Sequence, residues 1–274
     1  CLRRLRRLFP DKVEKVNQMS ITLKEKVAII TGAAQGVGAA FARRLSDEGC
    51  HVVITDKRES ISSVGEQIGA NWHIGNVSDP EHVRSVVDTT VAKFGAVDIL
   101  VNNAGEVLRT GPLDGWDESL SNYERLFGSN IRGAFLFGRA VAPIMAEQNY
   151  GEIVNVSTDH VKPAPGSSRH HGHGNMDLYN ASKWALNGLA FDWAKSLAGY
   201  NVRVNNLCIG ATDSEMIRSW SGPNPDPAWV ESWMKPEETA EVLVQLLLEG
   251  PKGRTGDNIG LYAGFPCVLP DPES

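Results

Sequence analysis

The feature that most constrains the fold of this chain is a regular alternation of short apolar runs with stretches of helical period. The apolar runs are continuous and rich in β-branched residues, as in parallel strands buried on both faces of a sheet. They are VAIIT (27–31), HVVIT (51–55), WHIGNV (72–77), VDILVNN (97–103), EIVNVS (152–157) and VRVNNLC (202–208). Amphipathic stretches lie between them, for example at 37–49 and 80–95. The pattern predicts an α/β domain, a doubly wound parallel sheet with helices on both faces.

Cysteine content and hydropathy bound the function before any motif is considered. The 274 residues are 42% hydrophobic and 22% charged, which is ordinary for a globular chain with a large core. The four cysteines, Cys1, Cys50, Cys208 and Cys267, show no CxxC spacing, which predicts neither a disulfide framework nor a zinc ribbon. Unpaired thiols indicate a reducing compartment, and we expect the cytoplasm. No apolar run approaches the roughly 18 residues of a membrane span, so we expect no membrane partner.

The charge of the chain is unevenly distributed. Residues 1–18 carry six basic and two acidic side chains, which leaves 21 basic and 31 acidic side chains in the remainder. An acidic body argues against nucleic acid as a partner. The basic segment has the leucine–arginine pattern of a membrane-surface or targeting helix, but the chain begins with Cys1, and Met19 stands just before the first strand pattern. We therefore interpret 1–18 as an extension outside the fold and 19–274 as a single domain.

A glycine-rich segment, TGAAQGVG (31–38), directly follows the first strand pattern and opens the first helix. Gly32 permits a tight turn, Gly36 allows the backbone to approach a pyrophosphate, and Gly38 allows the helix to pack closely on the strand. The alternative is an ordinary glycine-rich turn. The position between strand and helix favours a dinucleotide site in a Rossmann-like sheet.

Asp56 ends the second strand pattern, 18 residues after Gly38. A carboxylate at this place accepts hydrogen bonds from both hydroxyls of the adenosine ribose and repels a 2′-phosphate. Lys57 and Arg58 follow it and would favour a phosphate instead, whereas Gln35 in the glycine segment adds no positive charge. The balance predicts NAD as the cofactor rather than NADP.

Tyr179 and Lys183 are four residues apart in a stretch of helical period, YNASK (179–183). That spacing puts both side chains on one helix face, where the charge of a lysine favours the ionised form of a nearby phenol. We therefore predict that Tyr179 is a general acid/base, that Lys183 lowers its pKa, and that Lys183 also holds the nicotinamide ribose. The alternative is a surface pair without function, which is the commoner case for this spacing alone.

Four motifs occur in one order along the chain: TGAAQGVG, NNAG (102–105), YNASK and RTG (254–256). Together they resemble a short-chain dehydrogenase/reductase of the single-domain branch over about residues 24–264. The resemblance implies that Asn130 holds a water linking Lys183 to solvent. It also implies that Ser157 donates a hydrogen bond to the substrate oxygen as charge develops there, with the adjacent Thr158 as the alternative.

The resemblance also implies which residues contact the cofactor. NNAG flanks the adenosine half, Asn76 and Val77 lie beside the adenine, and the segment with Gly210 and Ser214 reaches the nicotinamide. The expected cofactor-binding residues are Gly32, Gln35, Gly36, Val37, Gly38, Asp56, Asn76, Val77, Asn103, Ala104, Gly105, Tyr179, Lys183, Gly210 and Ser214.

The substrate pocket is predicted from large side chains near the catalytic motifs. The candidates are Glu106, His160, Met216 and Trp220, with a lid around 212–235. Mostly apolar, bulky lining favours a cyclic or hydrophobic secondary alcohol or ketone. The alternative is that these side chains only pack the lid helices.

Residues 162–178 break the strand–helix rhythm and are rich in Gly, Pro, Ser and His, which predicts a loop that shapes the mouth of the pocket. His170, His171 and His173 raise the possibility of a metal site, because imidazoles are good zinc ligands. The flanking glycines favour a solvated loop instead, so we predict no metal.

These observations predict an NAD-dependent oxidoreductase that interconverts a secondary alcohol and a ketone. Dehydrogenation of a dihydrodiol, reduction of a 3-oxoacyl group and non-catalytic sensing of a dinucleotide stay open as alternatives. The helix around Tyr179 carries more apolar surface than one buried stripe needs, including Trp184, Phe191 and Trp193. We therefore expect a homotetramer or homodimer that acts on a small molecule.

Overall fold

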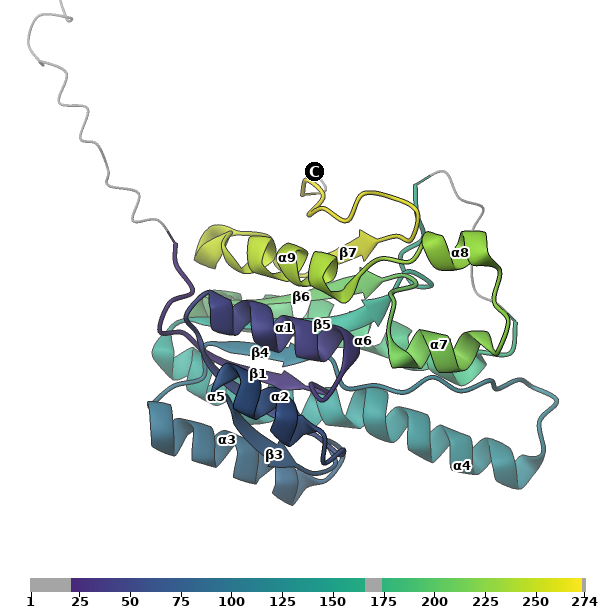
Figure 1. The fold of residues 1–274 in the computed structure, drawn as a ribbon. Coiled ribbons are helices and arrows are strands. Elements are labelled where there is room, and N and C mark those ends of the chain that lie inside the picture. The colour runs from purple at the N-terminus through teal and green to yellow at the C-terminus, as the bar shows by residue number, and fades with distance from the viewer. Residues whose placement is uncertain (1–20, 166–173, 273–274) are drawn as a thin grey trace, which may run out of the picture.

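The computed structural model describes residues 21–165 and 174–272, which contain a seven-stranded, all-parallel sheet (Figure 1). The strands are β1 (Val27–Thr31), β2 (His51–Asp56), β3 (Asn71–Ile74), β4 (Ile99–Asn102), β5 (Gly151–Thr158), β6 (Val202–Ile209) and β7 (Asn258–Leu261). Their order in the sheet is β3-β2-β1-β4-β5-β6-β7. The chain reverses its winding direction between β1 and β4, and ligands bind in the crevice at such a switch point. The predicted doubly wound fold is confirmed. The 1–18 extension lies outside the described residues.

Helices cover both faces of the sheet (Figure 1). Helices α1, α2 and α9 bury Phe41, Ile61 and Leu243 against one face, and α3, α5 and α6 bury apolar side chains such as Phe137 against the other. The helices are α1 (Gly36–Asp47), α2 (Ile61–Ile68), α3 (Pro80–Phe94), α4 (Trp116–Phe127), α5 (Gly133–Gln148), α6 (Asp177–Leu197), α7 (Glu215–Ser221), α8 (Pro227–Glu231) and α9 (Pro236–Leu247), with short turns η2 (Gly128–Arg132), η3 (Ala198–Tyr200) and η4 (Gly250–Lys252). None of the helices in the described parts is long and apolar enough to cross a membrane.

Three strands differ from the sequence prediction. The predicted strand 97–103 is shorter in the structure, where β4 covers Ile99–Asn102. The predicted strand 72–77 ends at Ile74, because the chain then turns into α3 and the Asn76 side-chain oxygen accepts a hydrogen bond from the Ser78 amide (3.0 Å). Strand β7 was not predicted. It is four residues long and buries only alternate residues, so it lacks the continuous apolar run that marks the central strands.

A buried cluster of ion pairs at the amino ends of β5 and β6 connects the sheet to α9. Arg203 on β6 is 2% exposed and donates to Glu152 on β5 (2.9 Å) and to the main-chain oxygen of Leu246 (2.9 Å). It also donates to Glu249 (3.3 Å), which in turn pairs with Arg254. Burial raises the pKa of Glu152, and the charge of Arg203 opposes that shift. The guanidinium therefore compensates a carboxylate that has no access to water.

Replacement of Arg203 by alanine is expected to lower the free energy of unfolding by about 3–5 kcal/mol, because Glu152 is left buried without its partner. Urea denaturation measures this change. The matched control is Arg44→Ala, which removes the more exposed pairs with Glu48 and Glu241 and should cost about 1 kcal/mol or less. If both variants lowered the free energy of unfolding equally, the stabilising role given to the buried Arg203–Glu152 pair would be contradicted.

Candidate active site

A large pocket opens at the carboxyl ends of the central strands, where the winding direction reverses. Its volume of about 1340 Å³ exceeds the ~300–1,000 Å³ usual for a drug-sized ligand. Residues that follow β1, β2, β4, β5 and β6 line it, together with α6 and α7, including Gly36, Asp56, Asn103, Thr158, Tyr179, Gly210 and Trp220. The pocket thus joins the predicted cofactor residues to the predicted catalytic residues.

The glycine segment forms a cradle at the amino end of α1. Gly32 and Gly36 have φ values of +67° and +55°, a region that favours glycine. A Cβ on Gly32 would come within 2.7 Å of Ala104 Cα, and a Cβ on Gly38 would overlap the carbonyl oxygen of Gly32. All three positions therefore require glycine. Gly36, Val37 and Gly38 at the amino end of α1 line the pocket, and the free amides of a helix amino end suit an anionic group such as a pyrophosphate.

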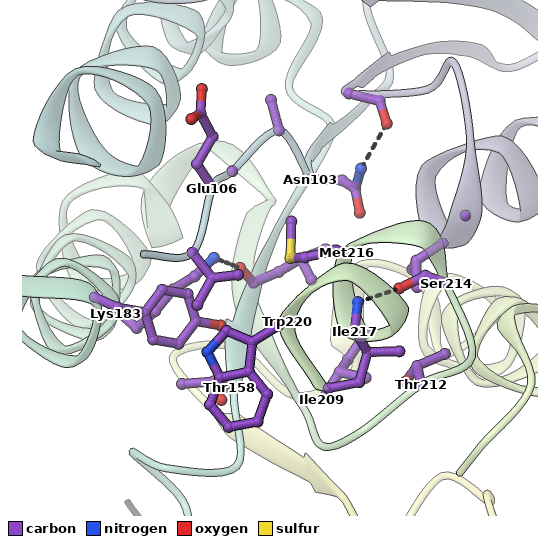
Figure 2. A pocket seen from close by; sticks show the side chains of 18 of the residues that line it. Asn103, Glu106, Thr158, Lys183, Ile209, Thr212, Ser214, Met216, Ile217 and Trp220 are labelled. Carbon is purple, nitrogen blue, oxygen red and sulfur yellow. Dashed lines mark hydrogen bonds between the residues drawn. The ribbon is translucent and has the colours of Figure 1, made fainter. Parts of the chain in front are cut away.

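Asn103 and Ala104 hold this cradle from the neighbouring strand. The Asn103 side-chain amide donates to the main-chain oxygens of Thr31 (2.9 Å) and Gly32 (3.0 Å), and Figure 2 marks one hydrogen bond of this amide. The backbone amides of Asn103 and Ala104 both donate to the Thr31 hydroxyl, at 3.0 Å each. The predicted NNAG segment therefore lies beside the glycine segment in the pocket. The Asn103 side chain supports the glycine turn.

Asp56 is fixed at the end of β2. It is 4% exposed, and its two oxygens accept from the backbone amides of Ala34 (3.1 Å) and Arg58 (3.0 Å). The Arg58 guanidinium lies 3.5 Å from the same carboxylate. Asp56 lines the pocket, so its carboxylate is held in place at the end of the pocket beside β2.

Asn76 and Val77 also line the pocket, but both have structural partners. The Asn76 side-chain oxygen, predicted to face the adenine, accepts from Ser78 in the turn before α3. Val77 packs against Gly133, where a Cβ would overlap the valine side chain. At the other end, Gly210 donates to Leu261 (2.8 Å), and Ser214 caps α7 beside Gly36.

Tyr179 and Lys183 face the pocket from α6, one helical turn apart. Lys183 is 5% exposed, and its ammonium donates to the main-chain oxygen of Val156 (2.8 Å), 5.7 Å from the centre of the Tyr179 ring. Burial raises the pKa of Tyr179 to about 12, and a hydrogen bond from Thr158 opposes the shift. Burial lowers the pKa of Lys183 to about 8. Desolvation is therefore the largest influence on both pKa values, and the effect of Lys183 on Tyr179 stays a prediction.

The hydroxyl beside Tyr179 belongs to Thr158 and not to Ser157. Both residues end β5 and border the pocket, but the Ser157 hydroxyl is directed at Asn187 Oδ1 (3.3 Å) and the Lys183 main-chain oxygen (3.4 Å). Successive strand residues point to opposite sides, which gives Thr158 the side that faces Tyr179, to which its hydroxyl is hydrogen-bonded. The Ser157 assignment is corrected accordingly, and we propose Thr158 as the hydrogen-bond donor.

Asn130 is placed by an irregular turn, not by a regular helix. The π-helical turn η2 interrupts the path from α4 to α5 and buries the Asn130 side chain. Its oxygen accepts from the Glu106 amide (2.7 Å), and its nitrogen donates to the Glu106 oxygen (3.0 Å) and to Ser182 (3.0 Å). These partners occupy the side-chain amide, and the predicted water held by Asn130 stays a prediction. Asn130 positions the backbone that follows NNAG.

The substrate end of the pocket is lined by the predicted His160, Met216 and Trp220. His160 Nδ1 lies 2.9 Å from Asn180 Oδ1, and its ring meets that of Tyr179 edge-on at 6.2 Å. Trp220 makes an edge contact with Trp229, which also lines the pocket. Figure 2 shows Glu106 on the other side of the pocket from Trp220. The structure therefore moves Glu106 from the substrate end to the cofactor end, because Lys57 and Arg125 bind its carboxylate.

Sequence reasoning did not find several other lining residues. Arg109 lies 4.7 Å above the Trp220 ring, and Tyr262 and Phe265 reach the pocket from the chain after β7. These residues carry no motif, so the sequence held no signal for them.

The histidine-rich segment falls partly outside the described residues, which exclude His170, His171 and His173. Its described ends at Pro163 and Met176 line the pocket, as expected of a loop at the mouth. Across residues 21–165 and 174–272, no three His, Cys, Asp or Glu side chains gather to hold a metal ion.

The glycine cradle and the tyrosine–lysine pair in one pocket are features of a Rossmann-type oxidoreductase. The chain belongs to the short chain dehydrogenase family, whose profile matches residues 26–224. It is 32% identical to the 3-oxoacyl-[acyl-carrier-protein] reductase FabG of Thermotoga maritima, across 89% of this chain and 98% of that protein. It is 29% identical to the cis-4-hydroxycyclohexanecarboxylate dehydrogenase of Sinomonas cyclohexanicum, across 91% and 100%. The 3-ketoacyl-(acyl-carrier-protein) reductase of Brucella melitensis complexed with NADH superposes with a TM-score of 0.75 at 28% identity, across 89% and 99%.

Proposed function

We propose that this chain is an NAD-dependent oxidoreductase that interconverts a secondary alcohol and a ketone on a cyclic or hydrophobic substrate. The observation that carries the proposal is one pocket that joins the glycine cradle to Tyr179, Lys183 and Thr158. The cradle fits a dinucleotide, because the glycines at 32, 36 and 38 form a tight strand-to-helix turn that brings the amino end of α1 to the pocket. A bound nicotinamide supplies the hydride acceptor or donor of the reaction.

The proton is handled by Tyr179. Its phenol is protonated at neutral pH, since burial raises its pKa to about 12, and it is therefore set to donate a proton to a ketone oxygen. In the opposite direction the ionised form, the phenolate, receives the alcohol proton and becomes the phenol again. The Thr158 hydroxyl, next to the phenol, stabilises the charge that develops on the same oxygen. Lys183 and the backbone amides of the cradle would hold the ribose and the pyrophosphate.

The fixed charges near Asp56 support NAD over NADP. Asp56 is an ordered anion where a 2′-phosphate would have to lie, and Arg58 is paired with it. Lys57 is paired with Glu106. Both basic residues that the sequence offers to a phosphate thus already have a carboxylate partner.

The substrate class is supported by bulky lining and by one relative. Met216, Trp220 and Trp229 provide apolar surface for a ring. One relative is named for oxidation of a hydroxycyclohexane carboxylate. Two relatives are named as reductases of acyl-carrier-protein thioesters, which keeps a 3-oxoacyl substrate as the second candidate. The excess of acidic residues disfavours an acidic carrier protein.

We further propose that the enzyme is a homodimer or homotetramer of the cytoplasm. Trp116 on α4 and Trp184 and Phe191 on α6 are 77%, 58% and 56% exposed, respectively. Large exposed aromatic side chains on neighbouring helices are typical of subunit contacts. Cys50, Cys208 and Cys267 are unpaired thiols, which suits a reducing compartment.

The test is formation of reduced nicotinamide by the purified protein with a panel of cyclic, terpenoid and aromatic secondary alcohols, with NAD and NADP in parallel. We expect turnover of at least one bulky alcohol with a preference for NAD. Turnover with NADP alone would contradict the role given to Asp56. Oxidation of 3-hydroxyacyl thioesters alone would favour the second candidate, and binding of NAD without turnover of any alcohol would favour a dinucleotide sensor.

A further inference from the structure

Two ion pairs that share Glu106 lie at the end of the pocket where the cofactor is proposed to bind. Glu106 Oε1 lies 2.5 Å from Lys57 Nζ, and Glu106 Oε2 accepts from Arg125 Nε at 2.6 Å. Lys57 follows β2, Glu106 follows β4, and Arg125 belongs to α4. All three line the pocket. These ion pairs therefore connect three separate elements at the end of the pocket where Asp56 lies.

Glu106 is a fixed anion. Its main chain is clamped from both sides by Asn130, through the amide (2.7 Å) and the carbonyl oxygen (3.0 Å). Its side chain is only 18% exposed. Burial alone would raise the pKa of Glu106, but hydrogen bonds from Lys57 and Arg125 hold that pKa below its usual range. The carboxylate is therefore ionised and immobile, whereas the Lys57 side chain is 53% exposed and depends on it for its position.

We infer that Glu106 selects the cofactor by holding Lys57 away from the 2′-position of the adenosine ribose. This inference rests on the proposed NAD preference and assigns it a second determinant besides Asp56. Lys57 directly follows Asp56 and is the residue whose ammonium would reach a 2′-phosphate if nothing engaged it. Glu106 removes that ammonium from the phosphate site and neutralises its charge. This disfavours NADP and leaves the ribose hydroxyls of NAD unaffected.

The experiment is calorimetric titration of wild type and Glu106→Gln with NAD and NADP, without substrate. The ratio of the dissociation constant for NADP to that for NAD is expected to fall by about tenfold in Glu106→Gln, since a released lysine gains a charge-assisted hydrogen bond. Glu118→Gln is the matched control, because Glu118 is an exposed carboxylate on α4 outside the pocket and its loss changes net charge equally. Its ratio should stay at the wild-type value.

Two lysine variants separate the mechanism from a general charge effect. Lys57→Ala should leave the ratio of wild type nearly unchanged, because Lys57 is already engaged, and Lys57→Ala/Glu106→Gln should lose the gain seen in Glu106→Gln. The inference would be overturned if Lys57→Ala/Glu106→Gln still showed the lower ratio of dissociation constants seen in Glu106→Gln. It would also be overturned if Lys57→Ala alone selectively lost affinity for NADP. A wild type that prefers NADP would overturn the proposed NAD preference separately, since the comparison of Glu106→Gln with the double variant still reports on Lys57.

Discussion

Replacement of Tyr179 by phenylalanine is expected to lower kcat by about 10²–10⁴-fold, because the variant loses the group that exchanges the proton with the substrate oxygen. The phenylalanine ring keeps the shape of the side chain and its edge contact with His160. Binding of NAD should therefore stay close to wild type. Steady-state kinetics with the best alcohol of the panel, combined with calorimetric titration of NAD, measures both quantities.

Tyr200→Phe is the matched control for this change. Tyr200 is 49% exposed and is not among the residues that line the pocket, so the same loss of a phenolic hydroxyl should leave kcat unaltered. A Tyr179→Phe enzyme with wild-type turnover would show that another group moves the proton. His160 is then the first candidate, because its ring contacts that of Tyr179 edge-on and also lines the pocket.

Replacement of Thr158 by valine is expected to lower kcat by about 10²–10³-fold, the effect of removing one donor to a developing oxyanion. Valine keeps the branched shape of threonine, so packing at the end of β5 is preserved. Thr158→Ser restores a hydroxyl and should retain most of the activity. The measurement is kcat and KM with the same alcohol used for Tyr179→Phe.

Ser157→Ala is the matched control that separates the two adjacent hydroxyls. It removes hydrogen bonds to Asn187 and to the Lys183 main chain, which should cost about 1 kcal/mol of stability and little activity. Loss of activity in Ser157→Ala with full activity in Thr158→Val would reverse the assignment and return the role to the serine that the sequence motif favoured.

The fold was largely predictable because its central strands are long apolar runs separated by helical periods. β5 and β6 are eight residues each and buried along their length, so periodicity alone identifies them. β7 is held mainly by its neighbour β6 and buries alternate residues, so its own sequence carries little signal. The π-helical turn around Asn130 has no sequence signature either, because its sequence reads as a continuation of the helical period.

The positions of site residues were predictable where a motif fixes the backbone. They were not predictable where the direction of a side chain depends on which distant residue it contacts. The glycines at 32, 36 and 38 are required by local geometry, and the four-residue spacing of Tyr179 and Lys183 sets their common face. The direction of the Ser157 and Glu106 side chains depends on Asn187, Lys57 and Arg125, which are far away in the sequence. Such choices are made by tertiary contacts.

The central claim, hydride transfer between a secondary alcohol and a nicotinamide, is tested most directly with deuterium. The alcohol that turns over best in the panel is prepared with deuterium on its carbinol carbon and incubated with the enzyme and NAD. Mass spectrometry should find one deuterium in each reduced nicotinamide for each ketone formed. Ketone formation without deuterium in the nicotinamide, or binding of NAD with no ketone from any alcohol of the panel, would contradict the account.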